Sequence, residues 1–415
     1  MKIFKARHLL PIGASPVADG ALLVDGSRIV SVGGQRELTA AHPGVAVVDF
    51  GEAVILPPLV NAHTHLELTD FPQWAEAAGE AAEPGDFVDW IQRLVRVRRT
   101  VGDLEVAASL HKGLWDSLAA GTGVIGDILT TLAARPAYAG TSLSGRIFAE
   151  VLGVDAERVA TRLTEIAGRL ATPPSPALQW GLSPHAPYTL SAATLAQASA
   201  FAVQRGLPLA MHWAETAAEI DFLNSARGPI ERLYAAAGWP CPPKPSGEGG
   251  PTLADLPPGS LLVHGAHLRD DEVDDVARAR QSVVLCPRSN SRFGAKRAPL
   301  ETLRRAGVLL ALGTDSRASS PSLSVWDELA FAQSWFAGIL DPKEWLEIAT
   351  LGGARALGLD GRMGCLAPGR EASFQVLAVP DGAVAATLAE ALCAEGHRTP
   401  PRFLYLHGEN VLPHP

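Results

Sequence analysis

Two histidines, His63 and His65, stand two residues apart in the sequence NAHTHLEL, just after the apolar run of residues 53–60. Along an extended strand, residues i and i+2 point to the same side, so both imidazoles could bind one metal ion. Two chance histidines would give the same pattern, because the chain contains 12 of them. The elements around this pair therefore decide between a metal site and coincidence.

The elements that would position these histidines follow a repeating pattern, in which an apolar run of strand length precedes a polar residue. Eight runs of this kind span residues 53–60, 121–126, 145–149, 178–182, 207–211, 260–263, 282–285 and 308–312. Segments between them, such as residues 104–118 and 192–204, have the apolar spacing of amphipathic helices. The repeat predicts an α/β fold, a closed (β/α)8 TIM barrel, whose active site lies at the C-terminal ends of its strands.

Side chains that could do chemistry follow these runs. In chain order they are His63 and His65, Asp127, Glu150, His185, His212 with Glu215, His264, Arg288 with Asn290, and Asp315. Five of the 12 histidines of the chain belong to this set, which a random scatter would not easily produce. The pattern therefore favours one polar site at the C-terminal mouth of the barrel.

Both ends of the chain predict a second, smaller domain. Residues 20–34 contain short alternating segments around turn signals, which indicate β-strands rather than strand–helix units. The tail contains two segments with a similar pattern, residues 378–388 and 402–411. We expect residues 1–57 and 366–415 to form a small β-sandwich, and residues 58–365 to form the barrel.

Two segments resemble insertions into the barrel. Residues 69–89 carry Phe71, Trp74 and Phe87, with Trp90 just beyond them. They could form a lid over the barrel mouth, or an extra helix whose aromatic side chains pack in the core. Residues 238–258 contain CPPKPSGEGGP, which predicts a surface connection without chemistry.

Charge and cysteine usage restrict the partners and the compartment. The net charge of -9 over 415 residues argues against a nucleic-acid surface, and the basic cluster at residues 93–99 is short. No signal segment or membrane-spanning apolar stretch is seen. Four scattered cysteines favour reduced thiols: Cys241, Cys286, Cys365 and Cys393. We expect a cytoplasmic protein whose partner is a small molecule rather than a nucleic acid or a membrane. The sequence leaves open whether the protein forms a homodimer.

Six motifs in a fixed order carry a resemblance to a known superfamily. They are NAHTHLE (His63, His65), SPHAPY (His185), HWAE (His212, Glu215), HGAHL (His264, His267), CPRSN (Arg288, Asn290) and GTDS (Asp315). The set resembles the amidohydrolase superfamily, in particular the branch with cytosine, guanine and S-adenosylhomocysteine deaminases and triazine chlorohydrolases. The resemblance covers nearly the whole chain, including TLGGARALGL at residues 350–359. One departure is GREAS at residues 369–373, where the family commonly has Gly-x-x-Ala-Asp.

The resemblance implies one divalent cation. Its ligands would be His63, His65, His212 and Asp315, and such donors suit zinc, or ferrous iron as the alternative. Relatives with two metals bridge them with a carboxylated lysine on the fourth strand. This chain has His185 there and no lysine in residues 169–205, so we expect a single metal.

The resemblance also implies three catalytic residues. Glu215 would pass a proton from a metal-activated water to the substrate, and His264 would orient that water. Asp315 would share in proton transfer. The alternative for Glu215 is a solvated acid at the start of a helix, where acids are common. His267 is assigned no catalytic part.

Four residues are candidates for substrate contact: His185, Arg288, Asn290 and Trp90. His185 and Arg288 lie where relatives contact substrate, Asn290 could form hydrogen bonds around the site, and Trp90 could stack on a flat ring. Ser316 could add a hydrogen bond beside Asn290. An arginine after a strand is as often a salt-bridged loop residue, so both interpretations of Arg288 stay open.

The predicted function is that of a metal-dependent hydrolase acting on carbon–nitrogen bonds other than peptide bonds. The most specific version is hydrolytic deamination of an amino-substituted N-heterocycle, such as a purine nucleoside of the aminofutalosine type. The same fold and metal could instead hydrolyse a cyclic amide or a chlorotriazine, because neither defines the leaving group. A barrel that only binds a small molecule is disfavoured, since binding alone needs no proton-transfer residues.

Overall fold

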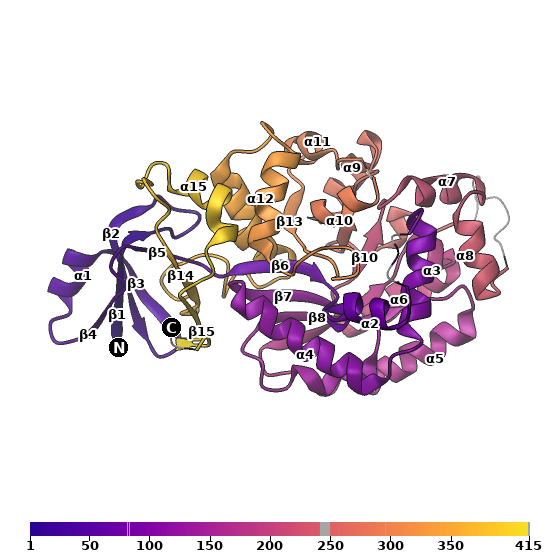
Figure 1. Cartoon of the computed structure of the whole chain (residues 1–415), viewed down its shortest axis with the longest axis horizontal. Coiled ribbons are helices and arrows are strands. Elements are labelled where there is room, and N and C mark those ends of the chain that lie inside the picture. The colour runs from indigo at the N-terminus through magenta and orange to yellow at the C-terminus, as the bar shows by residue number, and fades with distance from the viewer. Residues whose placement is uncertain (81, 83, 241–249, 295, 414–415) are drawn as a thin grey trace.

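The computed structural model describes residues 1–80, 82, 84–240, 250–294 and 296–413. It has two regions, which lie side by side along the longest axis of the molecule (Figure 1). One is a small sheet built from both ends of the chain, and the N and C marks lie there. The other is a larger set of strands surrounded by helices. None of the described helices is long and apolar enough to cross a membrane.

Eight parallel strands form the centre of the larger region. The first four-stranded sheet consists of β6 (Leu59–Thr64), β7 (Thr122–Leu129), β8 (Ser144–Val151) and β9 (Leu178–Pro184). The second consists of β10 (Ala210–Trp213), β11 (Leu261–His264), β12 (Ser282–Leu285) and β13 (Leu309–Leu312). Isolated parallel bridges, Leu182 to Leu209 and Thr64 to Asp315, connect the two sheets. Every predicted run therefore contains or borders a parallel strand.

The first run is shared between two sheets. Residues Ala53–Leu56 form β5 of the small sheet, and the chain then passes through Pro57 and Pro58 into β6. Proline has no N–H to donate to a strand ladder, so this pair separates the two strands.

The parallel strands are buried almost throughout, which explains why their sequences are continuously apolar rather than alternating. One apolar cluster, which we call the inner cluster, takes side chains from strands of both sheets, including Val60, Val124, Val263 and Val284. A separate and larger cluster lies between strands and helices and includes Leu110 and the other buried apolar side chains of α4 and α6.

Helices follow most of the strands. They are α4 (Asp103–Ala119), α5 (Ala156–Ala167), α6 (Ala192–Arg205), α7 (Ala217–Ser225), α8 (Ile230–Ala237), α9 (Asp270–Arg278), α10 (Pro287–Arg292), α11 (Leu300–Arg305), α12 (Val325–Trp335), α13 (Pro342–Glu347) and α14 (Gly353–Ala356). The helices predicted at residues 104–118 and 192–204 correspond to α4 and α6. The α6 helix begins after Ser191, whose Oγ accepts from the Thr194 N–H, and ends at Gly206 with φ 62°.

The small region is one eight-stranded sheet. Its strands are β1 (Lys2–Leu9), β2 (Val17–Asp25), β3 (Arg28–Gly34), β4 (Ala46–Asp49), β5, β14 (Phe374–Ala378), β15 (Phe403–Leu406) and β16 (Glu409–Asn410), with α1 (Gln35–Ala41) after β3. The antiparallel pairing of β14 with β5 joins the two ends of the chain. The strands predicted at residues 20–34 and 402–411 are present.

The strand predicted at residues 378–388 is wrong. Only Ala378 belongs to a strand, the next residues form turns, and α15 (Leu388–Glu395) begins at the end of the segment. Pro380 and Gly382 interrupt the strand, and the alanine- and leucine-rich sequence after them favours a helix. The α15 helix contacts α12 and α13.

The insertion after the first strand forms two helices, α2 (Phe71–Ala77) and α3 (Phe87–Arg98). The aromatic side chains of this segment pack: Phe71 and Trp74 belong to one cluster with Val97, and Phe87 belongs to another. In the second predicted insertion, residues 241–249 lie outside the described residues, and so does Cys241. The other three cysteines are free thiols.

One contact between the two regions is made by His407, in the turn between β15 and β16. Its Nδ1 lies 3.2 Å from Glu371 Oε2, and its Nε2 lies 3.2 Å from the carbonyl oxygen of Ser142, just before β8. The hydrogen bond to Glu371 is the main cause that raises the pKa of His407 above 6.5. Protonated His407 therefore links the small sheet to the larger region.

We expect His407→Asn to lower the free energy of unfolding by about 1 kcal/mol at acidic to neutral pH. Because the folded pKa is raised, the stabilisation is fully present below about pH 6.5 and is lost as the pH rises through the folded pKa. Asparagine tolerates the left-handed backbone at this position, where φ is 54°. Urea unfolding of both proteins at about pH 6 and about pH 9 measures the difference. An equal destabilisation at both values would contradict the assigned role.

Candidate metal and proton-transfer site

Four side chains meet at the C-terminal ends of the parallel strands, and we call them the metal cluster: His63, His65, His212 and Asp315. His63 lies on β6, His65 follows that strand, His212 lies on β10 and Asp315 follows β13. His65 Nε2 lies 3.3 Å from His212 Nε2, and Asp315 Oδ1 lies 3.6 Å from His65 Nε2 and 3.7 Å from His63 Nε2. All four residues are buried.

These distances fit a single ion. Donor atoms about 2.1 Å from a tetrahedral zinc lie about 3.4 Å from one another, close to the separations of this cluster. His63 supplies a second argument, because its Nε2 is buried and has no hydrogen-bond partner. A buried imidazole nitrogen without a partner is costly, and a metal would satisfy it.

The protonation states of three members of the cluster, His65, His212 and Asp315, are those of metal ligands. Burial lowers the pKa of His65 to about 3 and lowers that of His212 well below 6.5, so both imidazoles are neutral. Burial alone would raise the pKa of Asp315, but the nearby histidines, His63 first and then His65 and His264, hold it well below 3.8. A neutral imidazole and an ionised carboxylate are the forms that bind a cation.

Two hydroxyl groups orient Asp315. The Oγ atoms of Ser289 and Ser319 donate to Asp315 Oδ2 at 2.7 and 2.8 Å, which leaves Oδ1 to face the histidines. Neither serine was predicted as a site residue. Serines after a strand resemble ordinary loop residues, although Ser289 lies inside the CPRSN motif.

Beside the metal cluster lies a second candidate group, Glu215 and His264, which we call the proton-transfer pair after its predicted role. Glu215 Oε1 lies 3.6 Å from His264 Nε2, and both side chains are buried. Burial, followed by the charges of Asp315 and Glu219, raises the pKa of Glu215 well above 4.5. Burial lowers the pKa of His264 to about 4. The pair is therefore a protonated acid beside a neutral imidazole rather than an ion pair.

Asn290 contacts His264 and fixes which nitrogen carries the proton. Its amide Nδ2 lies 3.2 Å from His264 Nδ1, and an amide nitrogen can only donate. His264 Nδ1 is then the acceptor, and the proton resides on Nε2, which faces Glu215. The substrate contact predicted for Asn290 stays a prediction. Its hydrogen bond with His264 adds a second role, which is to set the protonated nitrogen of that imidazole.

Three of the eight described non-glycine residues with positive φ lie in this site. His264 has φ 76°, Asp315 has φ 57° and Ala214, next to Glu215, has φ 54°. Residues with a β-carbon rarely adopt these values, and such strain typically occurs at functional sites.

One of the predicted substrate contacts, His185, lies beside the metal cluster, and another, Trp90, contacts the loop after Asp315. The ring of His185 lies 4.9 Å from that of His212, and its Nδ1 lies 3.0 Å from Thr189 Oγ1. Trp90 on α3 donates from Nε1 to the carbonyl oxygen of Ala318, three residues after Asp315, at 3.1 Å. The insertion therefore reaches the loop that carries Asp315, and both residues remain candidates for substrate contact.

Comparison with known proteins shows the family of the chain. Residues 54–396 match the profile described as the Amidohydrolase family, and residues 20–44 match an imidazolonepropionase-like composite domain of bacteria. The chain belongs to the amidohydrolase family.

Relatives of this amidohydrolase include two kinds of deaminase. The aminodeoxyfutalosine deaminase of Deinococcus radiodurans is 32% identical over 354 residues, covering 82% of this chain and 81% of that protein. A 5-methylthioadenosine/S-adenosylhomocysteine deaminase of Nitratidesulfovibrio vulgaris is 29% identical over 377 residues, covering 87% and 80%. The structure of Helicobacter pylori aminofutalosine deaminase in complex with methylthio-coformycin has the same fold, with a TM-score of 0.83, 21% identity, and coverage of 99% and 100%.

The guanidinium group of Arg288 forms hydrogen bonds and an ion pair within the protein. Its Nε donates to Glu328 on α12, its Nη1 donates to Ser322 Oγ at 2.9 Å, and its Nη2 donates to the carbonyl oxygens of Ser322 and Ser324. The side chain is 8% exposed and that of Glu328 is 0% exposed. These contacts favour the salt-bridged alternative over the predicted substrate contact.

We therefore expect Arg288→Met to act on stability. The change leaves the carboxylate of Glu328 buried without its charged partner, since only the backbone N–H of residue 288 still donates to it. It should lower the free energy of unfolding by about 3–5 kcal/mol. Urea unfolding measures this loss, and the double variant R288M/E328Q, which removes the buried charge, should recover part of it. A stable R288M protein with a raised KM would instead support substrate binding.

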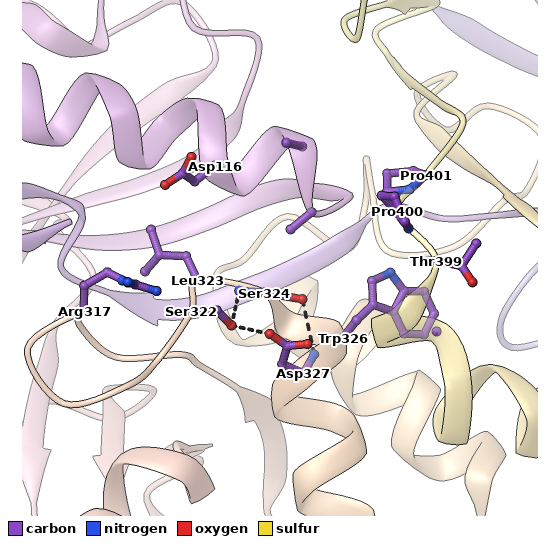
Figure 2. A pocket seen from close by; sticks show the side chains of 13 residues that line it. Asp116, Arg317, Ser322, Leu323, Ser324, Trp326, Asp327, Thr399, Pro400 and Pro401 are labelled. Atoms are coloured by element: carbon purple, nitrogen blue, oxygen red, sulfur yellow. Dashed lines mark hydrogen bonds between the residues drawn. The ribbon is translucent and has the colours of Figure 1, made fainter. Parts of the chain in front are cut away.

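A cavity of about 340 Å³ lies elsewhere in the molecule (Figure 2). Its walls include Asp116 on α4, Arg317, Trp326 and Asp327 on α12, and Pro401. None of its lining residues belongs to the metal cluster or the proton-transfer pair. We assign the chemistry to the strand ends rather than to this cavity.

Proposed function

We propose that this amidohydrolase catalyses hydrolytic deamination of an amino-substituted N-heterocycle, with an adenine nucleoside as the preferred class. The observation that carries the proposal is the position of buried Glu215, 3.6 Å from His264, beside the four converging donors of the metal cluster. Burial raises the pKa of Glu215, which favours its role as a proton donor. The deaminase relatives support the same reaction, and their nucleoside substrates suggest the class.

We propose that the eight parallel strands close into a (β/α)8 barrel. Two observations support this: parallel bridges connect the two sheets at both pairs of adjoining strands, and the inner cluster takes side chains from both sheets. Residues 58–365 would be the barrel domain.

We propose that residues 1–57 and 366–415 form a sheet folded over itself as a sandwich. Three strand spacings, about 14 Å, separate β1 from β15 in a flat sheet. The rings of Phe4 on β1 and Tyr405 on β15 nevertheless lie 4.9 Å apart. The sheet must therefore curl strongly around its aromatic core.

The residues present fit one divalent cation, and we propose zinc, with ferrous iron as the alternative. His63, His65, His212 and Asp315 would hold it, since three imidazoles and a carboxylate suit both metals. When bound, the cation would lower the pKa of a water molecule to about 7, giving a nucleophile at neutral pH. A cytoplasmic location and a homodimer stay predictions.

The proton-transfer pair would then act on the substrate. Glu215 gives its proton to the ring nitrogen next to the carbon that bears the amine, and it regains a proton from the attacking water. His264 donates its Nε2–H to the attacking oxygen and orients it. Glu215 passes the regained proton to the leaving amine, Asp315 takes the remaining proton of the attacking oxygen, and ammonia departs to leave a keto product. The proton on Asp315 then returns to Glu215. His185 and Trp90 would border the flat ring.

A substrate panel tests the proposal. The enzyme, saturated with zinc at neutral pH, is incubated with aminodeoxyfutalosine, 5-methylthioadenosine, S-adenosylhomocysteine, guanine, a chlorotriazine and a cyclic amide. We expect ammonia release stoichiometric with a keto product from at least one adenine nucleoside. If no amine reacts while the chlorotriazine or the cyclic amide does, the deaminase assignment fails and the hydrolase assignment survives.

A further inference from the structure

Glu219, in the first turn of α7, holds the backbone that carries Glu215. Its Oε1 accepts a hydrogen bond from the N–H of Ala214 at 2.7 Å, and its Oε2 accepts one from the N–H of Glu215 at 2.9 Å. The side chain is completely buried. One carboxylate thus receives two successive backbone N–H groups immediately before and at the proton-transfer residue.

These two N–H groups need partners because β10 ends at Trp213. A buried N–H without a partner is costly, and the neighbouring strand no longer supplies an acceptor. The peptide between Ala214 and Glu215 is also held on its other side, where the Ala214 carbonyl accepts from the N–H of His267 at 2.8 Å. Both ends of this peptide are therefore fixed, with Ala214 in the left-handed region at φ 54°.

We propose that Glu219 is a positioning residue, which fixes the backbone of Glu215 so that its carboxyl group faces His264 and the reacting atoms. The proposal rests on the proposed function, because it assigns Glu219 a task only if Glu215 transfers the proton. Glutamate suits the task, since its two oxygens accept both N–H groups, whereas glutamine has one oxygen and would turn an NH2 group toward the second N–H.

Charge supports the geometry. Burial raises the pKa of Glu219 itself to about 7, so part of the population is ionised at neutral pH. The ionised form is one of the causes, after burial and Asp315, that raise the pKa of Glu215. The alternative is that Glu219 only stabilises the start of α7, as acids in first turns often do. In that case, another change at the same helix end should have the same effect on the enzyme.

The matched control is Thr216, the N-cap of α7. Its Oγ1 accepts from the N–H of Glu219 at 3.3 Å, so T216A weakens the start of the helix. The variant keeps the two hydrogen bonds that the Glu219 carboxylate accepts from the N–H groups of Ala214 and Glu215. The test variants are E219Q, which keeps the shape of the side chain, and E219D, which keeps the charge but shortens it. Each protein is loaded with zinc, and melting temperature, metal content, kcat and KM are measured.

We expect E219Q and E219D to lower kcat by about 10- to 100-fold, with KM within about threefold and one metal per chain. T216A should lower the melting temperature and keep kcat within about twofold of wild type. The proposal is overturned if kcat in both Glu219 variants stays within about twofold of wild type, or if T216A loses kcat to the same extent.

A crystal structure of E219Q separates this proposal from the proposed function. We expect the Glu215 carboxyl group to lie farther from His264 Nε2 than the present 3.6 Å, or Ala214 to leave the left-handed region. An unchanged arrangement would overturn the positioning role whether or not the enzyme turns over any substrate. A wild-type enzyme inactive on the whole panel would instead contradict the proposed function alone.

Discussion

Replacing Glu215 with glutamine should lower kcat by about two to four orders of magnitude while leaving the fold and the metal content intact. The side chain is buried, and its pKa is raised well above 4.5, so it holds a proton that glutamine cannot transfer. Glutamine has nearly the same shape and leaves the contact with His264 sterically unchanged. The measurement is kcat and KM on the best substrate of the panel, with metal content and melting temperature in parallel.

Glu150→Gln is the matched control. Glu150 is also a buried glutamate at a strand end, on β8, where its Oε2 accepts from Thr130 Oγ1 at 2.7 Å. We expect kcat of this variant to stay within a few-fold of wild type, because Glu150 belongs neither to the metal cluster nor to the proton-transfer pair. Near-normal kcat in E215Q, or an equal loss in E150Q, would remove Glu215 from the mechanism.

The parallel strands could be predicted from the sequence because a strand buried on both faces is a continuous run of apolar residues. A run such as residues 282–285 is apolar throughout, and β12 has these bounds. The position of the site followed from topology, since the carboxyl ends of parallel strands meet at one face. His63 and Asp315 are far apart in the chain, yet their donor atoms lie 3.7 Å apart.

Contacts that depend on distant packing could not be predicted in the same way. Arg288 follows a strand, as a substrate-binding residue would, but only the fold shows that Glu328 lies beside it. Glu219 looks like any acid in a first helical turn, and only the fold shows which N–H groups it accepts. The helix that begins at Leu388, by contrast, could have been predicted from the sequence. A proline and a glycine in residues 378–388 interrupt a strand and precede a helix-forming sequence.

The second large effect concerns the metal. We expect Asp315→Asn to reduce the bound metal from about one per chain to below about 0.1 and to abolish detectable turnover. Asp315 is the one anionic donor in the cluster, and its Oδ1 faces His63 and His65. Without the carboxylate, three neutral imidazoles must hold a doubly charged cation at a buried site, where uncompensated charge is costly. Elemental analysis after gel filtration, with zinc titration followed by melting temperature, measures the loss.

Ser319→Ala tests whether the orientation of Asp315 matters as well as its charge. This serine donates to Oδ2, the oxygen that does not face the histidines, so its removal keeps the charge and one of the two orienting hydroxyls. Losing such a partner of a ligand typically costs about 10- to 100-fold in metal affinity, so S319A should bind zinc more weakly but still saturate. Because a ligand that binds only the folded state stabilises it by about 2.7 kcal/mol at 100 times its Kd, wild type and S319A should melt higher with added zinc, and D315N should not.

A D315N protein that keeps stoichiometric metal would exclude Asp315 as a ligand, and the cation would then have to be held by the histidines alone or by Glu215, the other carboxyl group that lies close by.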